Sequence, residues 1–533
     1  MVRAKEIEKW FAEHIKDGDK PYLLDKYQAK IIGDTHSNIL VTARAGSGKT
    51  RTLVAKIVYL LAHEKIAPEE IIAFAFNKKA REEVNERLTH ITYDGVPLFD
   101  KTPTIASTFH AFAYETLGGR KVVGRKLISE GDERRIITEI LKKEFPNSAK
   151  MSKADFYSKV DTAQQFITRA EQKFFVDYKI LDELVETKLK KATKSSHEQL
   201  ETAQALFVLN KVLKKYQARL KREGLTNFNQ MVAQAAEKLK GQTTPYKFIL
   251  VDEYQDFSLL FLTMIRALRR TCPSARLLCV GDDWQAINRF AGSDVEFFLH
   301  FSKYFPNDNS KLFIPTNYRS GKRIVKNANY FMSRALKDYK GCKSGNKKTK
   351  AKIFVRNIDY GTESSSDLPL LLENYLKTCL KIIKENPGKS VMILHRNNEM
   401  SFRGWSIDRF VEQLRESAVK NHLLSRKKAD ELITGSTVHR SKGLESDVVV
   451  LLEIDAEKFP GKDKTHGLYS IFDENEKNLF TDECRLFYVA LTRPKERLYI
   501  LSKTTLVIKN NKNKSKAKLN FFSYLNDNWL IDF

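Results

Sequence analysis

The sequence predicts an α/β protein built on parallel sheets. Three apolar, strand-forming segments each run directly into a polar or glycine-rich turn, over residues 39–50, 248–256 and 277–290. The first turn is followed by a helix-forming run over 51–62, which gives the strand–turn–helix order of parallel α/β units. Ligands of such sheets bind at the carboxyl ends of the strands, so the three turns are expected to lie at one functional edge.

The first turn has the composition of a phosphate-binding loop. It reads Ala45-Gly46-Ser47-Gly48-Lys49-Thr50. Its two glycines let successive backbone N–H groups point at one anion, and the following helix adds its positive amino end. We expect Lys49 to reach the β- and γ-phosphates of ATP and Thr50 to bind Mg²⁺. The usual pattern begins with glycine where this chain has Ala43, and the alternative is an ordinary glycine-rich turn.

The second segment delivers two carboxylates at the end of a buried-type strand. Asp252 and Glu253 directly follow the apolar run at 248–251. We expect Asp252 to face the same Mg²⁺ as Thr50, and Glu253 to orient or deprotonate the attacking water. A solvated acidic turn is the alternative, but the phosphate loop upstream favours ATP hydrolysis.

The order of these motifs resembles that of the UvrD/Rep family of superfamily 1 DNA helicases. The loop at 43–46 and the third segment, which ends in Phe290, carry the resemblance. Further matching motifs lie at 24–28, 317–320, 437–445 and 485–493. The resemblance covers nearly the whole chain and implies two RecA-like parallel-sheet domains, with ATP and Mg²⁺ as cofactors. It also implies movement along single-stranded DNA from 3′ to 5′.

The same resemblance implies which residues hold the nucleotide. Gln28 would read the adenine base, while Arg51 and Tyr318 would pack on it. Glu445 would accept a hydrogen bond from the ribose. Gln285 would lie beside the γ-phosphate and report its presence.

Two arginines of the second half, Arg319 and Arg493, match the family's γ-phosphate contact and arginine finger. Phosphoryl transfer spreads negative charge over the γ-phosphoryl oxygens, and a cation supplied at that moment stabilises it. Because both arginines would arrive only when a second domain closes, hydrolysis would be tied to domain motion. Taken singly, an arginine or glutamate beside a strand is usually only a solvated flank.

Aromatic and basic residues near the same turns are candidates for DNA contact. Phe290 occupies the position of a family tryptophan that stacks on an unpaired base, whereas Asn288 replaces a tyrosine found in many relatives. Phe76 matches a DNA-contacting aromatic residue, and Lys79 is expected near phosphate. The remaining candidates are Thr108, His110 and His439.

Composition favours a polyanionic partner and an intracellular setting. There are 92 Lys and Arg residues against 66 Asp and Glu, for a net charge of +26, although basicity does not distinguish DNA from RNA. The five cysteines are scattered without metal-ligand spacing, which argues for a reducing compartment. Neither a signal segment nor a long uninterrupted apolar run is recognisable, so we expect a cytoplasmic protein with no membrane partner.

We predict four parts along the chain. The first RecA-like core (1A in the family) is expected at 1–117 and 226–315, with a helical insertion (1B) at 118–225. The second core (2A) is expected at 316–505. Between Arg319 and Thr437 too few residues remain for a full-size 2B insertion. The region 506–533 reads as a basic tail and an apolar end, which would cover either its own core or a partner.

The function predicted is that of an ATP-dependent single-stranded-DNA translocase and 3′-to-5′ helicase, acting in repair, recombination or defence against foreign DNA. Its partners would be single-stranded and tailed double-stranded DNA, with a nuclease or repair protein as a further candidate. The alternative is a DNA-stimulated ATPase subunit that recruits or activates a nuclease and unwinds little. A P-loop kinase or small-molecule ATPase is disfavoured, because the motifs of the second half would then have no role.

Overall fold

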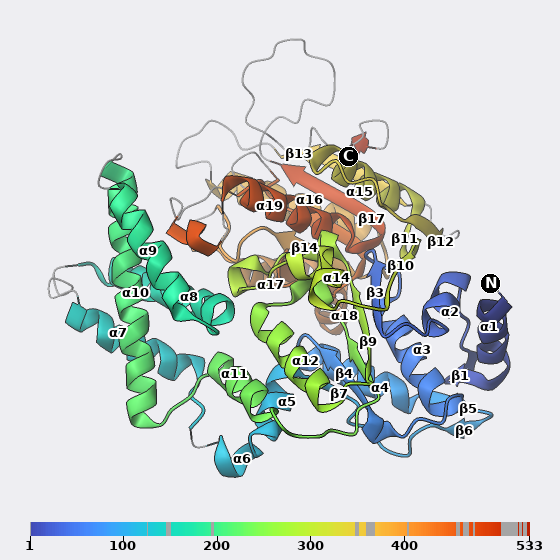
Figure 1. Cartoon of the computed structure of the whole chain (residues 1–533). Coiled ribbons are helices and arrows are strands. Elements are labelled where there is room, and N and C mark those ends of the chain that lie inside the picture. The colour runs from blue at the N-terminus through green and yellow to red at the C-terminus, as the bar shows by residue number, and fades with distance from the viewer. Residues whose placement is uncertain are drawn as a thin grey trace. The chain divides into compact units, whose positions relative to one another are not determined.

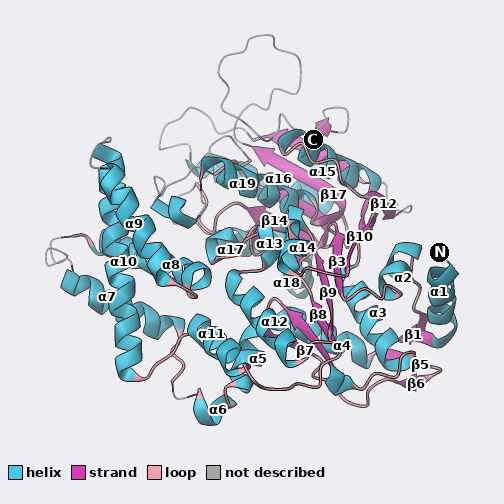
Figure 2. Ribbon diagram, viewed as in Figure 1, coloured by secondary structure: helices cyan, strands magenta, loops and turns pink. Residues whose placement is uncertain are grey.

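The computed structural model separates the chain into two compact units. The described residues are 2–532 except 125, 145–150, 193–196, 347–350, 359–367, 402–403, 455–458, 462–467, 473–474, 503–520, 522–524 and 526–529. The first unit comprises Met1–Thr42, Lys49–Phe313 and Asp463–Asn478, and the second comprises Ala43–Gly48, Ile314–Lys462 and Leu479–Phe533. Each unit contains a six-stranded sheet with parallel pairs and helices, which confirms the predicted α/β class (Figure 2).

The first unit is organised by the sheet β10-β3-β9-β8-β4-β7. Its strands are β3 (Asn38–Ala43), β4 (Ile71–Ala75), β7 (Ala106–Thr108), β8 (Phe248–Val251), β9 (Arg276–Gly281) and β10 (Asn309–Ile314). The pairs from β3 through β7 are parallel. All four residues of β8 are buried, as expected for a parallel strand covered on both faces. The three predicted turns therefore follow neighbouring strands at their carboxyl ends.

Helices and short turns complete this core. They are α3 (Lys49–Ala62), η1 (Pro68–Glu70), α4 (Lys78–Thr89), α5 (Phe109–Thr116), α6 (Gly119–Val122), α11 (Phe228–Lys238), η3 (Tyr254–Asp256), α12 (Leu259–Thr271), η4 (Asp283–Gln285), η5 (Arg289–Ala291), α13 (Glu296–Leu299) and α14 (Phe301–Tyr304). At the amino end lie α1 (Val2–His14), α2 (Lys26–Ile32) and a small sheet of β1 (Ile15–Asp17), β2 (Lys20–Pro21), β5 (Ile91–Tyr93) and β6 (Val96–Pro97). Phe74 of β4 stacks on Phe109 inside this core.

The described chain between α6 and α11 forms long helices joined by short turns (Figure 1). The helices are α7 (Glu130–Glu144), α8 (Lys153–Phe174), α9 (Tyr178–Ala192) and α10 (His197–Glu223). Helix α10 buries Leu206, Leu209, Leu213, Tyr216 and Leu220, whose spacing of three or four residues aligns them on one face. These helices group with the first unit, and the domain boundaries drawn from the sequence remain a prediction.

The second unit contains the sheet β15-β14-β16-β17-β13-β18. Its strands are β13 (Lys352–Asn357), β14 (Val391–His395), β15 (Ile433–Thr437), β16 (Ser446–Leu451), β17 (Pro494–Ser502) and β18 (Leu530–Asp532), and all their pairs are parallel. The remaining elements of the second half are β11 (Thr316–Gly321), α15 (Lys322–Ala335), β12 (Lys343–Asn346), α16 (Leu368–Lys384), α17 (Ile407–Lys420), α18 (Arg426–Leu432), η6 (Leu468–Phe472) and α19 (Glu476–Leu491). Two of these segments, η6 and the start of α19, group with the first unit.

The described residues of the apolar end, Phe521, Leu525 and 530–532, belong to the second unit and pack within it. Strand β18 pairs in parallel with β13, and Phe521 is fully buried. Four phenylalanine rings surround it: Phe331, Phe459, Phe480 and Phe487. The basic part of the tail, 506–520, lies outside the described residues. Among the helices described, none combines the length and apolar character that a bilayer crossing needs.

A buried carboxyl group joins the helical region to α11. Glu171 of α8 accepts hydrogen bonds from the side chains of Asn227 (2.8 Å), Asn229 (3.2 Å) and Gln230 (3.1 Å). Burial, with a contribution from nearby Glu133, raises the pKa of Glu171 to about 7. Tyr216 also enters this group, since its hydroxyl donates to Glu133 (2.6 Å).

This group gives the stability of the first unit a defined pH dependence. An unfolded glutamate titrates near pH 4.3, so between about pH 4.3 and 7 the folded state holds more protons and loses stability as the pH rises. Glu171→Gln cannot ionise, and we expect its melting temperature to rise relative to wild type between pH 5 and 8. Thermal unfolding at both pH values measures this, with the exposed Glu86→Gln as control. A pH-independent difference for Glu171→Gln would contradict the assignment.

Candidate nucleotide and DNA site

The loop between β3 and α3 is shaped to hold an anion. Gly46 and Gly48 have φ values of +71° and +80°, a region that favours glycine. A Cβ atom on Gly46 would lie 2.7 Å from Cβ of Arg319, so the close approach also demands glycine. The hydroxyl of Ser47 is buried and makes no hydrogen bond to any described group. The loop therefore offers backbone N–H groups, a spare hydroxyl and the amino end of α3 to a phosphate.

Asn317 anchors this loop. Its Nδ2 donates to the carbonyl of Ala45 (2.6 Å), and the backbone N–H of Tyr318 donates to the carbonyl of Gly46 (2.7 Å). These bonds explain why residues Ala43–Gly48 group with the second unit. Asn317 lies in the matching motif at 317–320, but its role becomes visible only in the folded chain, which shows what its side chain bonds.

The predicted metal-binding pair is in hydrogen-bond contact. The hydroxyl of Thr50 donates to Oδ2 of Asp252 (3.1 Å). Burial and the neighbouring Glu253 raise the pKa of Asp252, and Lys49 partly opposes this. A bound cation would remove the cost of this buried charge. The carboxylate at the end of β8 and the hydroxyl at the start of α3 are oxygen ligands of the kind that Mg²⁺ prefers, so the residues fit the ion.

Glu253 is held in an unusual backbone conformation. Its φ of +51° lies in the left-handed region that non-glycine residues rarely adopt. One carboxylate oxygen lies 3.8 Å from Nζ of Lys49, and the other accepts from Gln255. Backbone strain of this kind is found at functional sites, where the surrounding structure maintains it. Here it turns the carboxylate toward the lysine of the phosphate loop.

A chain of hydrogen bonds links this glutamate to Gln285. Gln255 donates to Glu253, and its Oε1 accepts from the backbone N–H of Asp282 (2.8 Å). Asp282 in turn accepts from Nε2 of Gln285 (2.6 Å). Gly281 permits this arrangement, since a Cβ there would lie 2.5 Å from Oε1 of Gln255. Gln255 is a second residue of the site that was not predicted from the sequence. It links Glu253 to Asp282.

Two of the residues predicted to meet the base, Gln28 and Arg51, are placed by α2 and the start of α3. Gln28 is buried, and its Oε1 accepts from the backbone N–H of Asp25 (3.1 Å) in a capping box. The guanidinium of Arg51 lies 4.0 Å from the ring of Tyr22, whose hydroxyl donates to the carbonyl of Arg51 (2.8 Å). Tyr22 was not predicted, although an aromatic residue shortly before the glutamine motif was visible.

The second unit gathers its predicted arginines around the turn after β15. Arg319 donates to Glu445 (2.6 Å), which also pairs with Lys495 (3.1 Å). Burial opposes ionisation of Glu445, but these two cations outweigh it and lower its pKa. Arg493 is buried and donates to the carbonyls of Val489 (2.9 Å) and Leu444 (3.0 Å). The side chain of Tyr318 is exposed.

The residues predicted to contact DNA fall into two groups. Phe290 on η5, Phe76 after β4 and Lys79 at the start of α4 are exposed, as a docking surface requires. The others have structural partners. Thr108 caps α5 by accepting from Ala111 N–H, and the ring of His110 packs edge-on against Phe228 and Phe261.

His439 differs from the other candidates in its electrostatics. It lies in the turn after β15, and burial together with Arg396 and Lys442 lowers its pKa to about 4. The imidazole is therefore neutral at physiological pH. It can offer a hydrogen bond to DNA, but no charge.

Comparison with known protein families finds a match in the amino-terminal half of the chain and another toward its carboxyl end. A model of the UvrD/REP helicase N-terminal domain matches residues 24–306, more than half of the chain. The chain belongs to the UvrD/REP helicase family. A model of the UvrD-like helicase C-terminal domain matches residues 403–505. The resemblance drawn from the sequence is thereby confirmed.

Individual helicases are similar to different extents of the chain. DNA helicase IV of Escherichia coli K12 is 28% identical over 511 residues, which are 90% of this chain and 68% of that protein. A probable DNA helicase II homolog of Mycoplasma capricolum is 28% identical over 71% of this chain and 49% of its own length. ATP-dependent DNA helicase PcrA of Staphylococcus aureus is 28% identical over 57% of this chain and 39% of its own length. The chain thus spans half or less of the latter two.

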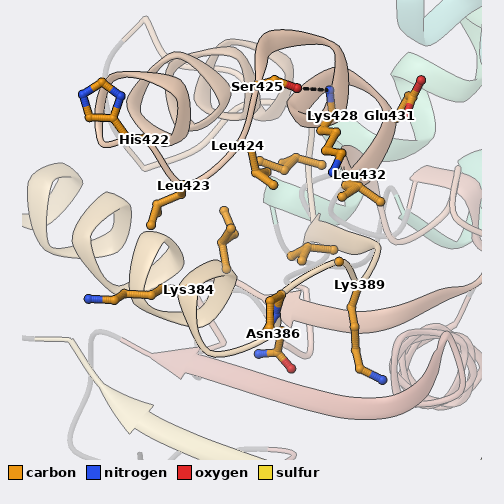
Figure 3. A pocket seen from close by; sticks show the side chains of 15 residues that line it. Lys384, Asn386, Lys389, His422, Leu423, Leu424, Ser425, Lys428, Glu431 and Leu432 are labelled. Atoms are coloured by element: carbon orange, nitrogen blue, oxygen red, sulfur yellow. Dashed lines mark hydrogen bonds between the residues drawn. The ribbon is translucent and has the colours of Figure 1, made fainter.

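A cavity of about 690 Å³ in the second unit lies apart from this site. Its lining includes Val391 and Ile433, the first residues of β14 and β15, whereas Thr437 and the turn toward Glu445 lie at the carboxyl end of β15. Figure 3 shows other lining side chains, among them Leu424 and Lys428. No residue predicted for the helicase site lines it.

The roles assigned to Lys49 and Glu253 can be separated. Lys49→Ala removes the loop's cation, so both ATP binding and turnover should be lost. Glu253→Gln should still bind ATP but turn over about 10²-fold more slowly or worse, as expected for a lost general base. Binding of a fluorescent ATP analogue and steady-state phosphate release measure the two properties. Glu69→Gln, at the amino end of β4, is the control, and normal turnover in Glu253→Gln would refute the role.

Exposure of Phe290 makes its stacking role testable. If a base packs on the ring, Phe290→Ala should weaken single-stranded DNA binding by about 1–3 kcal/mol. Fluorescence anisotropy with a labelled oligonucleotide measures the affinity. Phe207→Ala, at a comparably exposed phenylalanine on α10, is the matched control. A lower melting temperature with unchanged affinity would instead make Phe290 a packing residue.

Proposed function

We propose that this chain is an ATP-dependent translocase on single-stranded DNA and a 3′-to-5′ DNA helicase, with ATP and Mg²⁺ as cofactors. The observation that carries the proposal is the set of contacts at one sheet edge, where the phosphate loop meets the Thr50–Asp252 pair and Glu253. Family membership supplies the substrate class. Tailed duplexes are the expected substrates, in repair, recombination or defence.

The residues of the phosphate loop and of the neighbouring strand ends have distinct roles in hydrolysis. Lys49 and the loop N–H groups bind the phosphates, while Thr50 and Asp252 hold Mg²⁺, which when bound neutralises phosphate charge. Glu253 accepts the proton of the attacking water. Gln285, joined to Glu253 through Gln255 and Asp282, responds to the γ-phosphate at the start of the segment that leads to the exposed Phe290.

Arg319 and Arg493 act on the charge that develops in the transition state. A cation in this role accelerates related nucleotidases by about 10³- to 10⁵-fold. Both side chains already have several carbonyl or carboxylate acceptors in the second unit. We propose that binding of ATP draws at least Arg319 from Glu445, which would then be available to the ribose.

The alternative of a regulatory subunit with little unwinding keeps two arguments, the apolar end of the sequence and the short second-half insertion. In the described part of that end, β18 pairs with β13 and Phe521 packs among phenylalanine rings, so these residues contact the chain itself. The shortness of the second-half insertion still favours weak, partner-dependent unwinding. A nuclease or repair protein therefore remains a candidate partner.

Strand separation by the purified chain distinguishes these functions. We expect ATP-dependent unwinding of a duplex with a 3′ single-stranded tail and little with a 5′ tail, because the motor must load on the strand it follows. Release of a fluorescent strand is the readout, and Glu253→Gln is the inactive control. Preference for the 5′ tail would reverse the polarity. DNA-stimulated hydrolysis without unwinding of either duplex would favour the regulatory subunit.

A further inference from the structure

A short segment of the second half is built into the helical region of the first unit. Residues 468–472, which form η6 and are here called the strap, belong to the first unit, whereas 461 and 479 belong to the second. Three strap side chains, Tyr469, Ile471 and Phe472, are buried in the core of α7 to α10. The ring of Phe472 lies edge-on to Phe166 at 5.4 Å and also contacts Phe174. The strap therefore completes the core of the helical region.

Polar contacts fix the strap to two helices. The hydroxyl of Tyr469 donates to the carbonyl of Thr162 (3.2 Å) on α8, and the guanidinium of Arg169 lies 4.1 Å from its ring. Arg169 is itself buried. Ser470 accepts from Nζ of Lys188 (2.7 Å) on α9. An apolar anchor and directed polar bonds together hold the strap in one position.

The same helix backs the loop that carries Phe290. Thr162, Phe166 and Arg169 recur every three or four residues, and Gln172 follows one turn later. A Cβ atom on Gly292 would lie 2.4 Å from Oε1 of Gln172, so the end of η5 is pressed against α8. Helix α8 therefore touches both the strap and the candidate DNA loop.

In the chain, the strap is followed by α19, the helix that leads to Arg493, the proposed arginine finger. Helix α19 begins at Glu476 and runs to Leu491, about 24 Å at 1.5 Å per residue. Its last eight residues are buried, and Arg493 donates back to the carbonyl of Val489 in that helix. Three residues, 473–475, connect the strap to α19, and 473 and 474 lie outside the described residues. Along the chain, the strap and Arg493 are therefore joined by this short connection and one helix.

We propose that the strap is a positioning element that couples DNA at Phe290 to Arg493, through α8 and α19. This inference rests on the proposed helicase function. Its residues touch neither nucleotide nor DNA. The strap residues determine how strongly DNA bound at the Phe290 loop accelerates ATP hydrolysis. Because the second-half insertion is short, the helical region has to provide this coupling.

The test compares hydrolysis with and without DNA in strap variants. Phe472→Ala should keep basal turnover, the KM for ATP and single-stranded DNA affinity, while stimulation of kcat by DNA falls about fivefold or more. Phe156→Ala is the control, because it opens a similar cavity in the same core nearer the amino end of α8. Tyr469→Leu keeps apolar volume but loses the contacts with Thr162 and Arg169, and it decides the matter if Phe472→Ala does not fold.

The outcomes separate the two proposals. Full DNA stimulation in Tyr469→Leu or in folded Phe472→Ala overturns the strap's role and leaves the helicase assignment intact. An equal loss in Phe156→Ala also overturns it, because general packing would then explain the effect. Wild-type hydrolysis that ignores DNA overturns the proposed function and the coupling together.

Discussion

The site depends on two adjacent carboxylates at the end of a buried strand. Asp252 and Glu253 are neighbours, and burial raises the pKa of Asp252. Only cations and hydrogen-bond donors can stabilise such a pair, and the start of α3 supplies both through Lys49 and Thr50. The carboxylates at the strand end are therefore stabilised by the start of α3, and the phosphate loop is positioned beside them. In the proposed ATP complex, this arrangement would place a phosphate and a divalent cation side by side.

The fold and the centre of this site could be predicted because their signals are local. The loop at 45–50 and the acidic pair at 252–253 each lie within a few residues of a strand, where backbone conformation is set by neighbouring sequence. The helical spacing in α10 is equally local. The order of the motifs along the chain then indicated the UvrD/Rep helicase family rather than a simple P-loop enzyme, and the family match confirms this.

The contacts between segments that are distant in the chain could not be predicted from the sequence. Asn317 bonds the loop at Ala45, 272 residues away, and the pairing is not encoded in either neighbourhood. Gln255 becomes important only because Gly281 brings another strand end against it. The buried carboxyl of Glu171, and the strap within the helical core, also depend on tertiary packing. The destination of the apolar end of the sequence was open for the same reason.

The first unit is assembled from three separated stretches of chain, and this affects the order of folding during synthesis. A ribosome that has reached residue 313 has produced every strand of the first sheet except the last residue of β10, yet Tyr469 and Phe472 are still missing from the helical core. Until they emerge, the apolar faces around Phe166 and Phe174 lack a cover, a condition in which nascent chains recruit chaperones. The helical core of the first unit can therefore be completed only after residues 314–462 of the second unit have been synthesised.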